Sequence, residues 1–182
     1  MNLPNALSFL RIFSVPLLIW LVLENHVAGA LWLFAVAGLT DALDGFIAKR
    51  FQMETELGQY LDPLADKLLL LSGFITLTLF DLLPLWLTLL VVTRDVVIVG
   101  GALVYQVMTG SLQIKPLWIS KLNTVVQMLL LLLVLWSANR NNLGNWLELF
   151  IWLTAGTTLL SGGSYILAWS RLAAQQERMR QA

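Results

Sequence analysis

Six long apolar runs restrict what this sequence can fold into. They cover residues 9–23, 30–48, 61–80, 85–107, 117–136 and 146–169, with short polar segments between them. Most are close to the roughly 20 residues that an α-helix needs to cross the hydrocarbon core of a bilayer. Because backbone groups in lipid must be hydrogen-bonded within the protein, such runs favour helices. The pattern predicts an all-α integral membrane protein with six transmembrane helices.

Composition supports this fold class and excludes several functions. The chain is 58% hydrophobic and only 12% charged, whereas soluble domains carry about 25% charged residues. Its formal net charge is zero, which argues against a nucleic-acid partner. There is no cysteine for a disulfide or a thiolate site, and we expect the single histidine, His26, in a loop. Residues 1–182 are predicted to form a single membrane domain.

The distribution of basic residues predicts the orientation in the membrane. No basic residue precedes the first apolar run and no small-residue cleavage site ends it, so we expect a retained span rather than a signal peptide. The positive-inside rule places both termini in the cytoplasm, and we expect a bacterial inner membrane protein. The side with both termini carries Arg11, Lys49, Arg50, Lys115, Lys121, Arg171, Arg178 and Arg180, and the other side carries Arg140.

Four aspartates in the second and third runs are the main functional signal. Asp41 and Asp44 lie about 60° apart on one helix, and Asp62 and Asp66 about 40° apart on the next. The connector, residues 49–59, is short enough for a helical hairpin. We therefore expect the four carboxylates to meet at the cytoplasmic end of this hairpin. Such a cluster repels itself unless a cation lies within it.

The residues alone leave several interpretations of the cluster open. One is a structural polar network with Lys49, Lys67 and Arg94, and another is a proton or sodium pathway in a cation transporter. A non-catalytic scaffold would not explain the four aspartates. The favoured interpretation is a site for two Mg²⁺ or Mn²⁺ ions, because carboxylates suit hard cations and paired ions assist phosphoryl displacement.

Small residues accompany the aspartates. Gly45 and Ala48 share a helix face beyond Asp44, where they could serve ligand approach or helix packing. Gly58 could be a loop residue, although close approach of a ligand is preferred here.

A second polar group lies in the fourth run and around the start of the fifth. Arg94 lies inside the fourth, with Asp95 as a possible partner. Guanidinium and ammonium groups near a bilayer surface suit a phosphate, although Lys115 and Lys121 could also snorkel to lipid head groups. Lys121, Thr124 and Gln127 are predicted to share a helix face. This group consists of Arg94, Lys115, Lys121, Asn123, Thr124 and Gln127.

The stretch from Asp41 to Asp66 resembles the signature of the CDP-alcohol phosphatidyltransferases. The matching positions are Asp41, Asp44, Gly45, Ala48, Gly58, Asp62 and Asp66. Lys49 departs from the pattern, because the family usually has arginine there. Lysine keeps the charge and loses the bidentate fork of arginine.

The resemblance implies a six-helix enzyme that moves a phosphatidyl or similar group from a CDP-linked donor to an alcohol and releases CMP. Asp41, Asp44, Asp62 and Asp66 would hold the metals, and Asp66 would also be the base. The CDP site would comprise Gly45, Ala48, Lys49 and Gly58, beside Asp41 and Asp62. The family also implies a homodimer among membrane lipids.

Further segments are similar to the CMP-forming cardiolipin synthases within this family. They are residues 38–48, 61–67, 94–96 and 115–127. The resemblance implies CDP-diacylglycerol as donor and phosphatidylglycerol as acceptor. The alternative is a phosphatidylglycerophosphate synthase that uses glycerol 3-phosphate. Both acceptors carry a phosphate that Arg94, Lys115 and Lys121 could bind.

Overall fold

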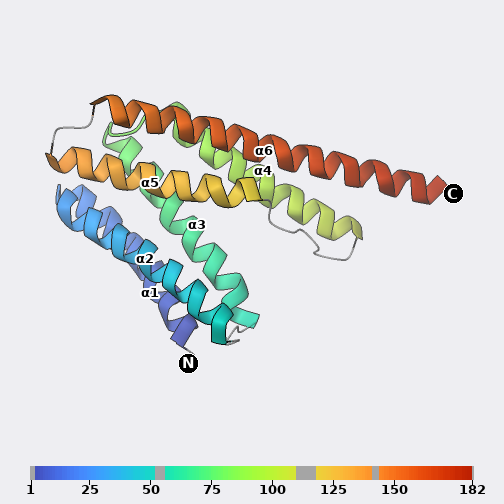
Figure 1. Ribbon diagram of the computed structural model, residues 1–182, viewed down its shortest axis with the longest axis horizontal. Coiled ribbons are helices and arrows are strands. Elements are labelled where there is room, and N and C mark those ends of the chain that lie inside the picture. Colours follow the sequence, from blue (N-terminus) through green and yellow to red (C-terminus); the bar gives the residue numbers. More distant parts are fainter. Residues whose placement is uncertain (1–2, 52–55, 110–117, 141–143, 182) are drawn as a thin grey trace. The chain divides into compact units, whose positions relative to one another are not determined.

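The computed structural model consists of six α-helices in the residues that it describes (Figure 1). The backbone is described for residues 3–51, 56–109, 118–140 and 144–181, and side chains for residues 9–40, 64–104, 118–139 and 144–170. The helices are α1 (Leu3–Leu23), α2 (Val27–Phe51), α3 (Glu56–Leu79), α4 (Leu85–Thr109), α5 (Trp118–Arg140) and α6 (Gly144–Gln181).

A helix covers each predicted apolar run to within one residue, and every helix extends beyond its run at one end or both. The difference that affects the signature residues is between α2 and α3, where residues 49–59 were expected to be a connector. Helix continues to Phe51 and resumes at Glu56, so the earlier boundaries were wrong. Lys49 and Gly58 therefore lie in helices. Polarity marks where apolar surface ends, whereas hydrogen bonding along the backbone can continue through polar residues.

The turns that follow α1 and α3 share the same backbone conformation and hydrogen-bond pattern. Asn25 after α1 and Asp81 after α3 both have positive φ, 57° and 58°. The next residue in each turn donates to a carbonyl five positions back: His26 N to Leu21 O at 2.8 Å, and Leu82 N to Leu77 O at 2.9 Å. This is the Schellman pattern, and Asn and Asp tolerate the left-handed conformation better than most residues. His26 lies in the loop, as predicted.

The chain divides into two compact units, which we describe separately. The first comprises residues 1–84 and 128–147, and the second comprises residues 85–127 and 148–182. Helix α5 contributes its C-terminal half to the first unit and its N-terminal half to the second. The prediction of one membrane domain over residues 1–182 stays a prediction.

In the first unit, α1 packs against both α2 and α3. Leu18 of α1, Phe34 of α2 and Phe74 of α3 are almost fully buried. A Cβ at Gly73 of α3 would lie 3.0 Å from Leu131 of α5, so the absence of a side chain permits close packing there. Phe13 and Trp32, in contrast, are 72% and 70% exposed. Large apolar side chains on the outside are expected where lipid is the solvent.

In the second unit, the buried face of α6 is unusually polar. Leu87 and Val91 of α4 are buried as a conventional apolar core would require. The inward residues of α6, however, include Thr154, Thr157, Thr158 and Ser161, all of them buried. Buried hydroxyl groups need hydrogen-bond partners, and this face therefore positions a polar network.

Three helices are long and apolar enough to cross a membrane within the described residues. The segments are Leu85–Val104, Trp118–Asn139 and Gly144–Ser170. Phe9–Leu23 and Val27–Thr40 are shorter apolar helices. The six-helix, all-α prediction is thus confirmed. Three of the six predicted spans meet the length and composition required, and the apolar character agrees with a membrane protein.

Candidate functional site

The aspartate signature lies on two helices, and the structure describes one of its side chains. Asp41 and Asp44 are on α2, while Asp62 and Asp66 are on α3. Both segments are helical through these positions, so the predicted angular spacing of each pair holds. The side chain of Asp66 is described. Those of the other signature residues and of Lys115 lie outside the described set, namely Asp41, Asp44, Ala48, Lys49 and Asp62, together with the positions Gly45 and Gly58.

Asp66 forms an ion pair with Arg11. The Arg11 Nη1 donates to Asp66 Oδ1 at 2.6 Å, joining α1 to α3 across 55 residues of sequence. The Arg11 side chain is 4% exposed and that of Asp66 is 26% exposed. A buried guanidinium is costly unless a hydrogen-bonded counter-charge accompanies it. The pair therefore fixes both side chains at the packing surface between the two helices.

Arg11 was expected only among the basic residues that mark the cytoplasmic side, and its contact with Asp66 was not predicted. A signal was present in the spacing along α1. Arg11, Ser14, Leu18 and Val22 recur at intervals of three or four residues, and all four are buried. Arg11 thus belongs to the inward face of its helix, where a charged residue requires a partner on a neighbouring helix.

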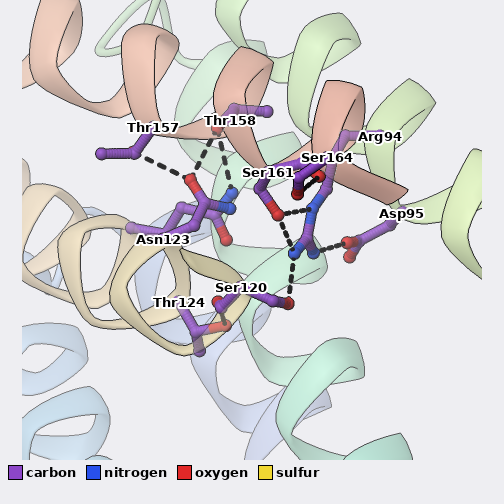
Figure 2. A network of polar contacts seen from close by, with 10 residues as sticks. Arg94, Asp95, Ser120, Asn123, Thr124, Thr157, Thr158, Ser161 and Ser164 are labelled. Atoms are coloured by element: carbon purple, nitrogen blue, oxygen red, sulfur yellow. Dashed lines mark hydrogen bonds and ion pairs between the residues drawn. The ribbon is translucent and has the colours of Figure 1, made fainter. Parts of the chain in front are cut away.

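Arg94 is the centre of the polar network in the second unit (Figure 2). Its Nη1 donates to Asp95 Oδ1 at 2.5 Å, which confirms the predicted pairing. Its Nη2 donates to Ser120 of α5 at 2.5 Å and to Ser161 of α6 at 2.7 Å. The Nε also donates to Ser161, at 3.2 Å. Groups from three helices therefore hold the guanidinium of Arg94, whose side chain is only 7% exposed.

A second set of contacts joins α5 to α6 one turn away. The Oδ1 of Asn123 accepts hydrogen bonds from Thr157 at 2.9 Å and from Thr158 at 3.0 Å (Figure 2). Gln127 donates a long bond of 3.5 Å to Thr158. Asn123 is fully buried. These bonds lock the register between the two helices through polar rather than apolar contacts.

The polar face of α5 differs from the predicted one. Lys121, Thr124 and Gln127 were expected to share a face. Lys121 is exposed and lies over the Trp118 ring at 5.3 Å, whereas Gln127 is buried. The buried polar residues of α5 are Asn123 and Gln127, four apart and therefore on one side of the helix. The sequence signal that could have predicted their partners is the helical spacing of four polar residues on α6, namely Thr154, Thr157, Thr158 and Ser161.

Comparison with known proteins identifies the family. The sequence model of the CDP-alcohol phosphatidyltransferase family matches residues 1–160 of this chain. The chain belongs to the CDP-alcohol phosphatidyltransferase family. The match contains the whole stretch from Asp41 to Asp66, and also Arg11, Arg94 and Asn123.

Named relatives include two enzyme types of this family. A rat cardiolipin synthase (CMP-forming) is 38% identical over 181 residues, covering 90% of this chain and 60% of the relative. Its human counterpart is 37% identical with the same coverage. A rice chloroplastic CDP-diacylglycerol–glycerol-3-phosphate 3-phosphatidyltransferase is 34% identical over 193 residues, covering 94% of this chain and 58% of the relative. The chain thus spans about 60% of the length of the curated relatives it matches.

The side chains of the signature fit a divalent metal. The four signature side chains are carboxylates, which hard cations prefer, and α2 and α3 each carry two of them at helical spacing. Among the side chains that the structure describes, no three His, Asp or Glu form a group that could hold an ion. Three of the four proposed ligands lie outside that set, so the metal site stays a prediction.

Proposed function

We propose that this chain transfers the phosphatidyl group of CDP-diacylglycerol to phosphatidylglycerol and releases CMP. The observation that carries this proposal is the carboxylate of Asp66, held on α3 by a buried arginine within the signature of the family. The cardiolipin synthase relatives, 37% and 38% identical over 90% of the chain, support the choice of acceptor.

The signature residues would have two roles in this reaction, metal binding and nucleotide binding. Asp41, Asp44, Asp62 and Asp66 would hold two Mg²⁺ or Mn²⁺ ions, which neutralise charge on the diphosphate when bound. The CDP moiety would lie against Asp41, Asp62, Lys49 and the small positions Gly45, Ala48 and Gly58. A helix surface without bulky side chains allows close approach of a nucleotide.

The chemical step is an in-line displacement at the phosphorus that carries diacylglycerol. The acceptor hydroxyl oxygen forms the new bond to this phosphorus, while the bond from the phosphorus to the bridging oxygen of the diphosphate breaks. The electron pair of that bond leaves with CMP, and the hydroxyl proton passes to the Asp66 carboxylate. Alignment of hydroxyl, phosphorus and leaving oxygen supplies a large part of the rate.

Arg94, Lys115 and Lys121 are proposed to bind the phosphate of the acceptor. Arg94 supports this role because its guanidinium is held in place by hydroxyl groups of α5 and α6 and, among the described residues, by the carboxylate of Asp95. A fixed guanidinium suits a phosphate better than a mobile ammonium does. Lys121 is more exposed than Arg94 and lies beside Trp118. A lysine in this setting also suits the surface of a lipid bilayer.

The alternative acceptor is glycerol 3-phosphate. The rice relative and a Bacillus subtilis CDP-diacylglycerol–glycerol-3-phosphate 3-phosphatidyltransferase, 35% identical over 119 residues, favour it. Both acceptors offer a hydroxyl and a phosphate, so the same side chains would serve either reaction.

The wider setting is also part of the proposal. We infer that all six helices cross the membrane, with both termini and the aspartates at the cytoplasmic side of a bacterial inner membrane. The basic residues of the sequence support this orientation. We further propose a homodimer, which is the assembly implied by the family resemblance.

Product analysis with separate acceptors tests the proposal. Purified protein would receive CDP-diacylglycerol and Mg²⁺ with either phosphatidylglycerol or glycerol 3-phosphate, and CMP and lipid products would be measured. We expect cardiolipin and CMP with phosphatidylglycerol. Formation of phosphatidylglycerophosphate alone would establish the alternative acceptor, and absence of CMP in both reactions would refute the proposed function.

A further inference from the structure

The Arg11–Asp66 pair suggests that α1 contributes to the reaction, although the signature residues lie on α2 and α3. We propose that Arg11 is a positioning residue for the reaction, and that it holds the Asp66 carboxylate in its reactive orientation. This inference rests on the proposed function, because it concerns the base of that reaction. It adds a residue from a helix that carries none of the signature positions.

The burial of Arg11 argues against a surface role. Phe9 and Phe13, two positions on either side along α1, are 41% and 72% exposed. An arginine that snorkelled to the lipid head groups would expose its guanidinium. Arg11 instead is almost fully buried and faces α3, against which α1 packs. The side chain is therefore committed to the interior of the first unit.

The geometry of the contact explains how Arg11 could orient the base. The terminal torsion of an aspartate is broad, so the carboxylate of an isolated side chain can rotate. A charge-assisted bond of 2.6 Å from Nη1 to Oδ1 restricts this rotation. Ala65, next to Asp66, is fully buried, which anchors the α3 backbone at the same point. Functional groups must be held within roughly 0.5 Å and 10–20° of the productive geometry.

Two other roles could explain the same contact, and each makes a different prediction. In a purely structural role, the pair stabilises the packing of α1 on α3, and loss of Arg11 lowers the amount of folded protein without changing its turnover. In a substrate-binding role, Arg11 contacts the donor diphosphate, and its loss raises KM for CDP-diacylglycerol. A positioning role instead lowers kcat of the folded protein at nearly constant KM.

The first experiment tests the Arg11–Asp66 pair through protein unfolding and needs no activity assay. Unfolding of the metal-free protein would be compared for wild type, Arg11→Gln, Asp66→Asn and the double variant. Residues in contact give non-additive effects in such a cycle, whereas independent residues give additive ones. We expect the double variant to unfold at nearly the same midpoint as the less stable single variant. Additive effects would overturn the pairing on which the inference depends.

The second measurement tests positioning through kinetics per folded molecule. We expect Arg11→Gln to lower kcat on the order of 100-fold, as misplacement of a reacting group does, with KM for CDP-diacylglycerol changed by less than about threefold. Arg11→Lys retains the charge and should recover part of this loss. Ser14→Ala is the matched control, because Ser14 is buried one turn along α1 and its hydroxyl donates to the Arg11 carbonyl.

The outcomes separate the inference from the proposed function. An unchanged kcat in Arg11→Gln would leave a structural role, and a raised KM at constant kcat would assign Arg11 to the donor; either result would overturn the inference. A loss in Ser14→Ala equal to that in Arg11→Gln would do the same. If the wild-type protein released no CMP, the proposed function would fail, while the unfolding cycle would still report on the pair.

Discussion

Ser161 of α6 accepts two hydrogen bonds from Arg94 of α4, from Nε at 3.2 Å and from Nη2 at 2.7 Å. The serine hydroxyl thus binds one side of the guanidinium group, and Asp95 and Ser120 bind the other donors. Gly162 follows Ser161 and also lies beside the Arg94 side chain, which a Cβ at this position would meet at an ordinary contact distance of 3.6 Å. The position of the guanidinium therefore depends on α6.

Replacement of Ser161 by alanine should destabilise the protein by about 1–2 kcal/mol, because a buried charged donor loses its partner. Reversible unfolding in mixed micelles would measure this change. Ser164→Ala is the control, since Ser164 lies one turn further along α6 and donates to the Ser161 carbonyl rather than to Arg94. Equal destabilisation by both changes would contradict the importance of the Arg94 contact.

Arg94→Lys should impair the proposed binding of the acceptor. One ammonium group cannot reproduce the planar contacts to Asp95, Ser120 and Ser161 and also meet a phosphate. Initial rates should show KM for phosphatidylglycerol raised on the order of tenfold, with KM for CDP-diacylglycerol nearly unchanged. An increase confined to the donor would show that Arg94 serves a different substrate.

Asn123→Ala should weaken the contact between α5 and α6. The change removes the acceptor of two threonine hydroxyls and leaves a small cavity in a fully buried position. We expect a loss of about 1–3 kcal/mol in the free energy of unfolding. Thr124→Ala serves as the comparison and should cost much less, because the Thr124 hydroxyl donates to the Ser120 carbonyl of its own helix. Similar losses in the two variants would argue against the inter-helix role of Asn123.

Adjacent glycines on α4 provide a test of packing. An added Cβ at Gly100 meets no atom within 4 Å, whereas one at Gly101 would lie 1.7 Å from the Trp169 ring. Gly100→Ala should therefore be neutral or stabilising by up to about 1 kcal/mol through helix propensity. Gly101→Ala should destabilise by about 1–3 kcal/mol, since the indole must shift and this disturbs its contact with the Tyr165 ring. Thermal unfolding of both variants would check the sign of each effect, and a reversed order would contradict this packing.

The sequence predicted the helices better than their ends and contacts. Apolar runs of near-bilayer length predicted each helix, because hydrophobic length is a local property. The connector between α2 and α3 was predicted too long, since Lys49 and Gly58 are polar or flexible and yet remain helical.

Contacts between neighbours along the chain were also accessible from sequence. The pairing of Arg94 with Asp95 was predicted and is confirmed. The pair of Arg11 with Asp66 was not predicted, because it depends on how α1 packs on α3. The same holds for Asn123 with Thr157 and Thr158, whose register across two helices is a tertiary property. The spacing of the signature aspartates along each helix could be predicted from the sequence, whereas the arrangement of the four carboxylates around one site is still a prediction.

Metal-dependent CMP release by wild type and Asp66→Asn tests the central claim most directly. The account predicts CMP release from CDP-diacylglycerol that EDTA abolishes and that Mg²⁺ or Mn²⁺ restores. It also predicts a fall of roughly 100-fold or more in Asp66→Asn at unchanged helical content, as expected for loss of a base. CMP release that persists in EDTA, or full turnover in folded Asp66→Asn, would contradict it.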